Sequence, residues 1–175
     1  MSWDPVAPKP GDQAFDLLLL DETGKPVEIS SLARGGPLLA LVFRGPDDAA
    51  GLKMLREFRD QTLVLRRLGV SVCGVAHAEP SALRFMRDER GLGFPLLSDA
   101  DGTALPRWGM LDQAGLFLLG ADLRVKQRAL AGRLSADALL TFVRRGGARP
   151  PRLRDRLGQA LHALAHALRP RRLAR

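Results

Sequence analysis

Two adjacent carboxylates and an arginine lie where an α/β protein usually keeps its reactive groups. Six consecutive apolar residues, 38–43, predict a buried strand, and residues from about Leu52 onward have helical spacing. The turn between them contains Arg44, Asp47 and Asp48. The free N–H groups and the positive dipole end of a helix start favour an anion, and they would activate a cysteine thiolate. Because this turn has no cysteine, its chemistry is that of carboxylates beside a guanidinium group.

The simplest interpretation of these carboxylates is structural. An aspartate before a helix accepts hydrogen bonds from the first free N–H groups, which stabilises the helix by roughly 0.5–2 kcal/mol. Asp47 and Asp48 are therefore predicted to hold the turn. Arg44 is the candidate anion-binding residue, with Gly45 and the two aspartates around it, and its alternative role is an ion pair with Asp47 or Asp48.

The only cysteine, Cys73, lies in the apolar run 70–76, so we expect a small buried side chain without a helix terminus to stabilise its thiolate. A single cysteine excludes an intramolecular disulfide and a cysteine-based metal site. His77 follows the same strand, and we interpret it as a surface residue. The sequence predicts no metal site and no cofactor.

The predicted elements alternate between strand and helix, which indicates parallel strands joined by right-handed crossovers. We expect one globular domain, residues 1–145, with Ser135 capping its last helix. The predicted strands cover residues 15–20, 27–29, 38–43, 70–76, 94–97, 115–119 and 123–128, with long helices after the third and fourth of them.

Charge divides the chain into two parts. From Arg144 onward there are ten arginines against the single Asp155, a net charge of +9, whereas residues 1–143 carry a net charge of −1. The basic character therefore belongs to the tail. No apolar run approaches the roughly 18 residues of a membrane span, and no signal peptide is visible, so we expect a cytoplasmic protein, with the tail as its one route to a membrane surface.

The sequence of the tail predicts a Gly/Pro linker over residues 146–151, followed by an amphipathic helix over residues 152–175. Its opposite faces are a leucine stripe and a basic face, which includes Arg152 and Arg156. The stripe consists of Leu153, Leu157, Leu161, Leu164 and Leu168. We rank packing on the protein's own domain or in a homodimer first, and a protein partner or an anionic membrane surface second. We do not expect nucleic acid binding because the tail has no aromatic residues for stacking.

Four segments in this order resemble the peroxiredoxin family, the alkyl hydroperoxide reductase and thiol-specific antioxidant group. They are Pro10-Gly11-Asp12, Leu41-Val42-Phe43-Arg44-Gly45, Phe94-Pro95-Leu96-Leu97-Ser98-Asp99 and Gly115-Leu116-Phe117-Leu118-Leu119. The resemblance covers about residues 8–143. It implies a thioredoxin-like fold, with a central mixed sheet flanked by helices, and, for active members, reduction of hydroperoxides by a cysteine thiolate.

The chain departs from the family pattern where the chemistry would occur. By resemblance, Asp48 occupies the position of the peroxidatic cysteine and Gly51 that of the second cysteine. Ala114 stands where active members place the arginine that holds the thiolate. We therefore expect a non-catalytic domain that binds a ligand or partner. The alternative, by family descent, is thiol-dependent peroxide reduction through Cys73.

Overall fold

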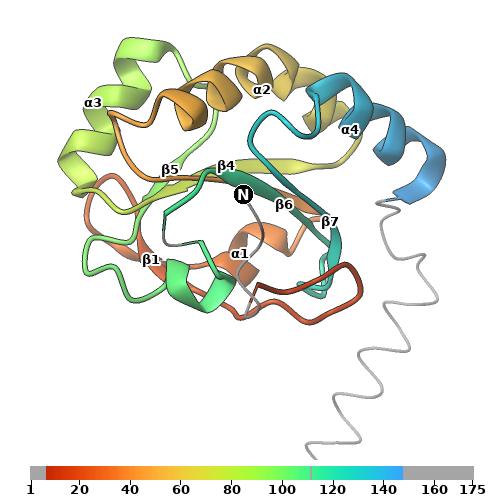
Figure 1. The fold of residues 1–175 in the computed structure, drawn as a ribbon, viewed down its shortest axis with the longest axis horizontal. Coiled ribbons are helices and arrows are strands. Elements are labelled where there is room, and N and C mark those ends of the chain that lie inside the picture. Colours follow the sequence, from red (N-terminus) through yellow and green to blue (C-terminus); the bar gives the residue numbers. More distant parts are fainter. Residues whose placement is uncertain (1–6, 111, 148–175) are drawn as a thin grey trace, which may run out of the picture.

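The computed structural model describes residues 7–110 and 112–147 of the chain. They form one seven-stranded mixed sheet in the order β2-β1-β5-β4-β3-β6-β7, with helices on both faces (Figure 1). This arrangement confirms the predicted α/β class and central mixed sheet.

The centre of the sheet consists of parallel strands, and both edges are antiparallel. The parallel strands are β3 (Leu38–Phe43), β4 (Ser71–Ala76) and β5 (Leu96–Ser98). The antiparallel strands are β1 (Leu18–Leu20) and β2 (Pro26–Glu28) at one edge, and β6 (Gly115–Leu119) and β7 (Val125–Leu130) at the other. A hairpin therefore closes each edge, as the sequence predicted.

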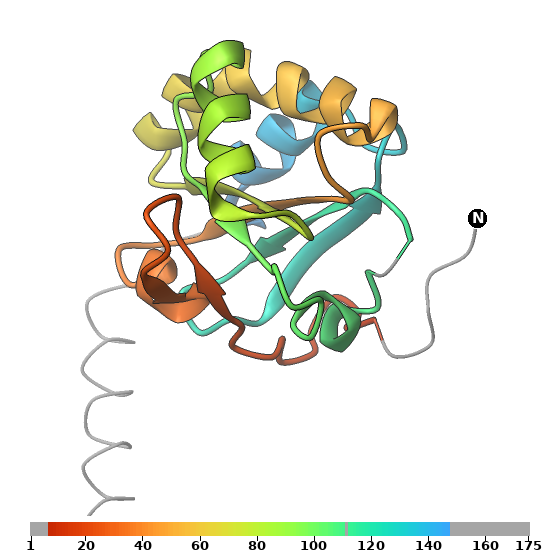
Figure 2. The same cartoon turned by 90° about the vertical axis from the view of Figure 1, so that its left-hand side faces the viewer.

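Three helices cover one face of the sheet, and shorter helical segments cover the other (Figure 2). The first face carries α2 (Ala49–Arg67), α3 (Pro80–Arg90) and α4 (Ala136–Phe142), and a final helical turn, η2, spans Val143–Gly147. The second face carries α1 (Ile29–Ala33) and the 3-10 helix η1 (Leu105–Trp108). Ser135 accepts a hydrogen bond from the N–H of Ala138, which confirms the predicted cap of the last helix.

A hydrophobic core lies on each face of the sheet, and β3 contributes side chains to both because successive side chains of a strand point to opposite faces. Leu39, Leu41 and Phe43 pack under the three long helices. Leu38, Ala40 and Val42 pack into the second core, around Trp108. All six residues are fully buried, so the strand and the turn that follows it have a rigid base.

Some element boundaries differ from the predicted ones. The first strand starts at Leu18 instead of Phe15 because the carbonyl of Phe15 accepts from the Trp108 indole and not from a neighbouring strand. The last strand starts at Val125 because the carbonyl of Leu123 accepts from the N-terminal segment.

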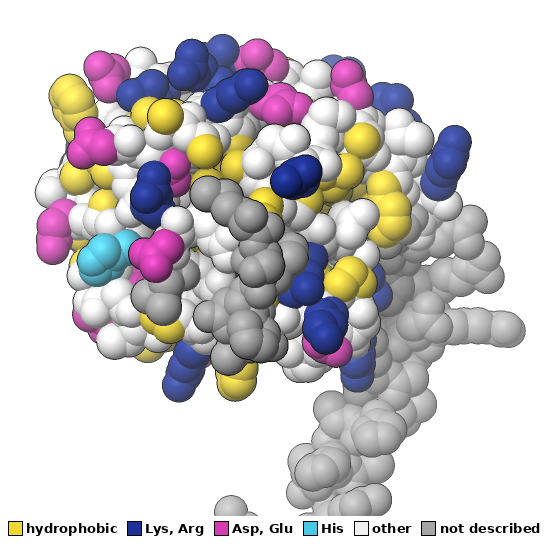
Figure 3. All heavy atoms as spheres, viewed as in Figure 1, with side chains coloured by type: hydrophobic (Ala, Val, Ile, Leu, Met, Phe, Trp, Pro, Cys, Tyr) yellow, Lys and Arg dark blue, Asp and Glu magenta, His cyan; other side chains and the backbone are white. Residues whose placement is uncertain are grey.

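The predicted linker, 146–151, begins inside the last helical turn, which continues to Gly147. The rest of the linker and the predicted amphipathic helix, 152–175, lie outside the described residues. Among the residues that are described, no helix is long and apolar enough to cross a membrane. On the face shown in Figure 3, basic and acidic side chains are interspersed, in keeping with the nearly neutral charge of residues 1–143.

Candidate functional site

The turn after β3 forms one wall of a cleft of about 390 Å³. The cleft lies at the carboxyl ends of the parallel strands β3 and β4, where open α/β sheets bind ligands. It is lined by Arg44, Gly45, Pro46, Asp47, Asp48 and His77. The structure therefore brings together all four residues predicted to form the anion-binding turn, and it adds a histidine.

Asp48 is the buried centre of this turn, with 3 % of its surface exposed. One carboxylate oxygen accepts a hydrogen bond from the N–H of Gly51 at 3.1 Å, and the other accepts from the N–H of Arg44 at 3.0 Å. Asp48 is thus the N-cap of α2, as predicted, and the helix begins at Ala49 instead of near Leu52 because the cap fixes its start.

Arg44 lies beside this carboxylate but is not fully engaged by it. One guanidinium nitrogen is 3.7 Å from Asp48 Oδ1, which confirms the predicted ion pair but is too long for a hydrogen bond. The Arg44 side chain is 57 % exposed. Asp47 is also exposed. Most of the guanidinium N–H donors therefore remain available to a molecule in the cleft.

Gly51, one turn into α2, packs directly against β3. A Cβ atom at this position would lie 2.4 Å from Phe43 Cβ and 2.8 Å from Asp48 Oδ2. Real Cβ atoms do not approach others so closely, and Phe43 Cβ is fixed to the strand backbone. The position expected for a second cysteine therefore has no space for any side chain in this structure.

His77 is the site residue that sequence reasoning missed. Its Nδ1 is 2.8 Å from the carbonyl oxygen of Asp99. Because a carbonyl only accepts, Nδ1 carries a proton, and in the neutral ring Nε2 is an acceptor. The Asp99 carboxylate in turn accepts from the N–H groups of Ala104 and Leu105, which holds the loop that orients the ring. The signal available in the sequence was the position of His77 at a strand end.

Cys73 is not part of the cleft. It lies in the middle of β4, fully buried in the second core beside Ala40 of β3. Burial raises the pKa of the Cys73 thiol to about 12. A thiol in this environment is protonated at neutral pH and is out of reach of solvent, as the apolar sequence around it predicted.

Ala114 lies close to the turn in the fold. Gly115 pairs with Val42 in the antiparallel register of β6 and β3. One residue further, Ala114 lies opposite Phe43, at the end of β3 that leads into the cleft. Ala114 is buried and contributes only a methyl group. Ala114 therefore lies beside the turn and places no charged group there.

A comparison with known families identifies this architecture. The profile of the AhpC/TSA family matches residues 10–129, which include the whole cleft. The chain belongs to the AhpC/TSA family. Two relatives from Mycobacterium tuberculosis, both named as peroxiredoxins, support this. Rv2521 is 31 % identical over 108 residues, which cover 62 % of this chain and 68 % of the relative. Rv1608c is 28 % identical over 135 residues, which cover 77 % of each chain.

Solved structures of family members have the same fold. Peroxidoxin BcpB from Mycobacterium tuberculosis has a TM-score of 0.72 and 25 % identity, over 79 % of this chain and 97 % of that one. Peroxiredoxin Q from Xanthomonas campestris has a TM-score of 0.66 and 18 % identity, over 80 % and 97 % of the two chains. The predicted peroxiredoxin resemblance and thioredoxin-like fold are both confirmed.

Proposed function

We propose that this AhpC/TSA-family protein is not a peroxidase and that it binds a small anionic ligand or a partner at the cleft. The observation that carries the proposal is the buried carboxylate of Asp48, which caps α2 at the position where the family resemblance expects the reactive thiol. A carboxylate is a poor nucleophile toward an O–O bond, and it has no oxidation states comparable to those of sulfur.

The surrounding groups support the same interpretation. Ala114 offers no cation to polarise a peroxide, and Gly51 has no room for a resolving thiol. The alternative, peroxide reduction through Cys73, requires a thiolate, whereas burial raises the pKa of this thiol to about 12. Peroxide would also have to enter a closed core to reach the sulfur.

A binding role follows from what the cleft still offers. Arg44 presents an exposed guanidinium group, whereas His77, whose Nδ1 donates to the Asp99 carbonyl, offers an acceptor at Nε2 that would take a hydrogen bond only from a protonated oxygen of the ligand. A guanidinium group binds phosphate or carboxylate oxygens through paired hydrogen bonds. A small anion is therefore the ligand class that the cleft favours, although Asp47 at the rim limits how much negative charge it accepts.

The first test is peroxide consumption with dithiothreitol as reductant, for the wild type, Cys73→Ser and Asp48→Cys. We expect the wild type and Cys73→Ser to match the protein-free rate. Asp47→Cys is the matched control for Asp48→Cys, because it places a thiol in the same turn at an exposed position instead of the helix cap. Turnover by the wild type that Cys73→Ser abolishes would overturn the proposal.

The second test is titration with inorganic phosphate, followed by ¹H–¹⁵N NMR. We expect saturable shifts of the amide signals of Arg44, Asp47, Asp48 and His77, and their loss in Arg44→Gln. An absence of shifts at these residues, or shifts that persist in Arg44→Gln, would refute anion binding at the cleft. The homodimer, the tail's association with a protein partner or membrane, and the cytoplasmic location stay predictions from the sequence.

A further inference from the structure

A second concave site lies between the β1–β2 turn and the outer face of α3. This groove has a volume of about 510 Å³, within the range of small-molecule sites. It is lined by Glu22, Thr23 and Gly24 of the turn and by Pro80, Ser81, Arg84, Phe85 and Asp88 of α3. None of these residues lines the cleft described above, so the groove is a separate feature.

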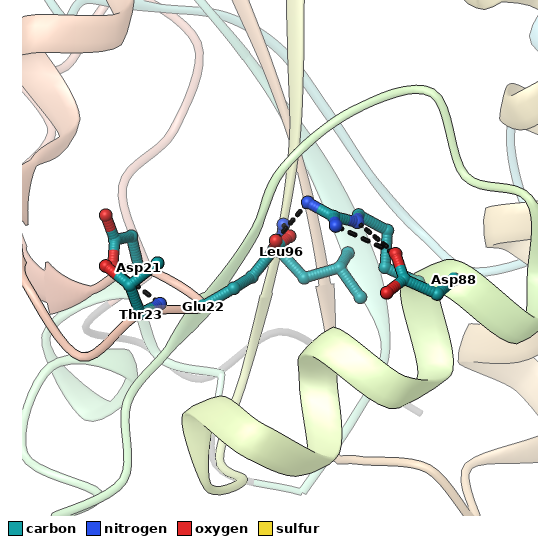
Figure 4. A network of polar contacts seen from close by, with 6 residues as sticks. Asp21, Glu22, Thr23, Asp88 and Leu96 are labelled. Carbon is teal, nitrogen blue, oxygen red and sulfur yellow. Dashed lines mark hydrogen bonds and ion pairs between the residues drawn. The ribbon is translucent and has the colours of Figure 1, made fainter.

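A network of polar contacts fixes the two walls of the groove relative to each other (Figure 4). The carboxylate of Glu22 accepts from Arg87 of α3 and from the N–H of Leu96 in β5. Arg87 also donates to Asp88 Oδ1 through Nη2, at 2.8 Å, and through Nε. Glu22 therefore joins the turn to the helix and to the sheet, and Asp88, on the same helix as Arg87, orients the Arg87 guanidinium group.

The turn is also closed from within. The Asp21 carboxylate accepts from the Thr23 hydroxyl at 2.7 Å and from the N–H groups of Thr23 and Lys25. These hydrogen bonds, above all the one from the Thr23 hydroxyl, stabilise the ionised carboxylate and lower the pKa of Asp21. A groove with both walls fixed is formed before a ligand arrives, which reduces the entropy lost on binding.

Arg84 and Phe85 line the groove and take no part in this network, as is also true of Gly24, Pro80 and Ser81. Phe85 is 72 % exposed, although it is one of the largest apolar side chains of α3. Arg84, its neighbour, is exposed and has no ion pair among the described residues, whereas Glu22 and Asp88 are both paired with Arg87. The groups free to bind a ligand therefore include an aromatic ring and a positive charge.

We propose that this groove binds a flat apolar molecule that carries one carboxylate, such as an aromatic carboxylate. The ring of the ligand would pack on Phe85, and its carboxylate would pair with Arg84. Aromatic rings attract each other beyond the area they bury, and paired hydrogen bonds from a guanidinium group favour a carboxylate over a neutral group of similar shape. The groove has room for a two-ring ligand.

The probe is 2-naphthoate, with the neutral 2-naphthalenemethanol as its uncharged counterpart, and binding is followed by ¹H–¹⁵N NMR. We expect naphthoate to shift the amide signals of Thr23, Gly24, Ser81, Arg84 and Phe85, with a dissociation constant on the order of 1 mM. The neutral probe should bind about fivefold more weakly, because it lacks the ion pair.

Two variants separate the two contacts. Phe85→Ala should weaken both probes by about fivefold or more, whereas Arg84→Gln should weaken naphthoate by about fivefold and leave the neutral probe within about twofold. The matched controls are Leu63→Ala and Arg56→Gln on α2, which change an exposed apolar residue and an exposed arginine outside the groove.

Three results would overturn the proposal. The first is an absence of shifts around the groove up to about 10 mM naphthoate. The second is equal affinity in Phe85→Ala, Arg84→Gln and the wild type. The third is an equal loss in the α2 controls, which would indicate nonspecific association with exposed apolar or basic side chains. Both groove substitutions are at exposed positions, so the variants are expected to fold.

Discussion

Replacement of Gly51 by alanine should destabilise the protein, although alanine is the better helix former. The added Cβ would lie 2.4 Å from Phe43 Cβ and 2.8 Å from Asp48 Oδ2. Overpacking of this kind costs about 1–3 kcal/mol. Displacement of the Asp48 carboxylate weakens the helix cap, which costs about 1 kcal/mol more. The higher helix propensity of alanine raises the free energy of unfolding by about 1 kcal/mol. The expected net loss is therefore about 1–3 kcal/mol, from a total stability of roughly 5–15 kcal/mol.

The assay is urea unfolding at equilibrium, in which this loss would lower the midpoint by about 1 M with an unchanged slope. Ala50→Gly, at the exposed neighbouring position, is the control: it changes only helix propensity and should cost about 0.5–1 kcal/mol. If Gly51→Ala were as stable as the wild type or more stable, the close packing of α2 on β3 would be refuted. The same clash predicts that Gly51→Cys fails to give a well-folded second thiol.

Two further substitutions test the cap and the buried thiol. Asp48→Ala leaves the N–H groups of Arg44 and Gly51 without an acceptor and should lower the free energy of unfolding in urea by about 1–3 kcal/mol. Asp48→Asn keeps one acceptor oxygen and should cost less. Equal losses in the two variants would contradict the capping role. Burial raises the pKa of the Cys73 thiol from its ordinary 9.0 to about 12, so protonation of this thiol favours the folded state. Between pH 9 and pH 12 the unfolded chain loses this proton and the folded protein keeps it. The free energy of unfolding should therefore fall by about 1.4 kcal/mol per pH unit as the pH rises from 9 toward 12. Cys73→Ala should remove this slope, and its persistence would show that another group causes it.

The sequence was sufficient for the family, the order of elements and the capping role of Asp48, because each depends on local patterns. The apolar run 38–43 and the turn after it were visible as a strand followed by a helix start, and the structure has both. The buried state of Cys73 was equally local, since the residues around it in β4 are apolar. The boundaries were less accurate where tertiary hydrogen bonds decide them, as at Phe15, whose carbonyl is taken by Trp108.

The role of His77 could not be predicted from its sequence neighbours. Its orientation depends on the carbonyl of Asp99, 22 residues away, and on the loop that the Asp99 carboxylate holds through Ala104 and Leu105. The groove beside α3 is likewise a product of long-range contacts. Arg87 meets Glu22 from 65 residues away, and only this contact indicates that Arg84, and not Arg87, is free to bind a ligand.

The contacts at the start of α2 explain why an aspartate is stable at position 48. The start of α2 needs an acceptor for its free N–H groups, and a negative charge there is stabilised by the helix dipole. The carboxylate of Asp48 meets both requirements, with one oxygen on Gly51 and the other on Arg44. A buried charge with its hydrogen bonds satisfied is stable, whereas the same charge without them is not. We predict that stability of the turn and peroxide chemistry are separable at this position, and Asp48→Cys tests the two independently when unfolding and peroxide consumption are measured on the same protein.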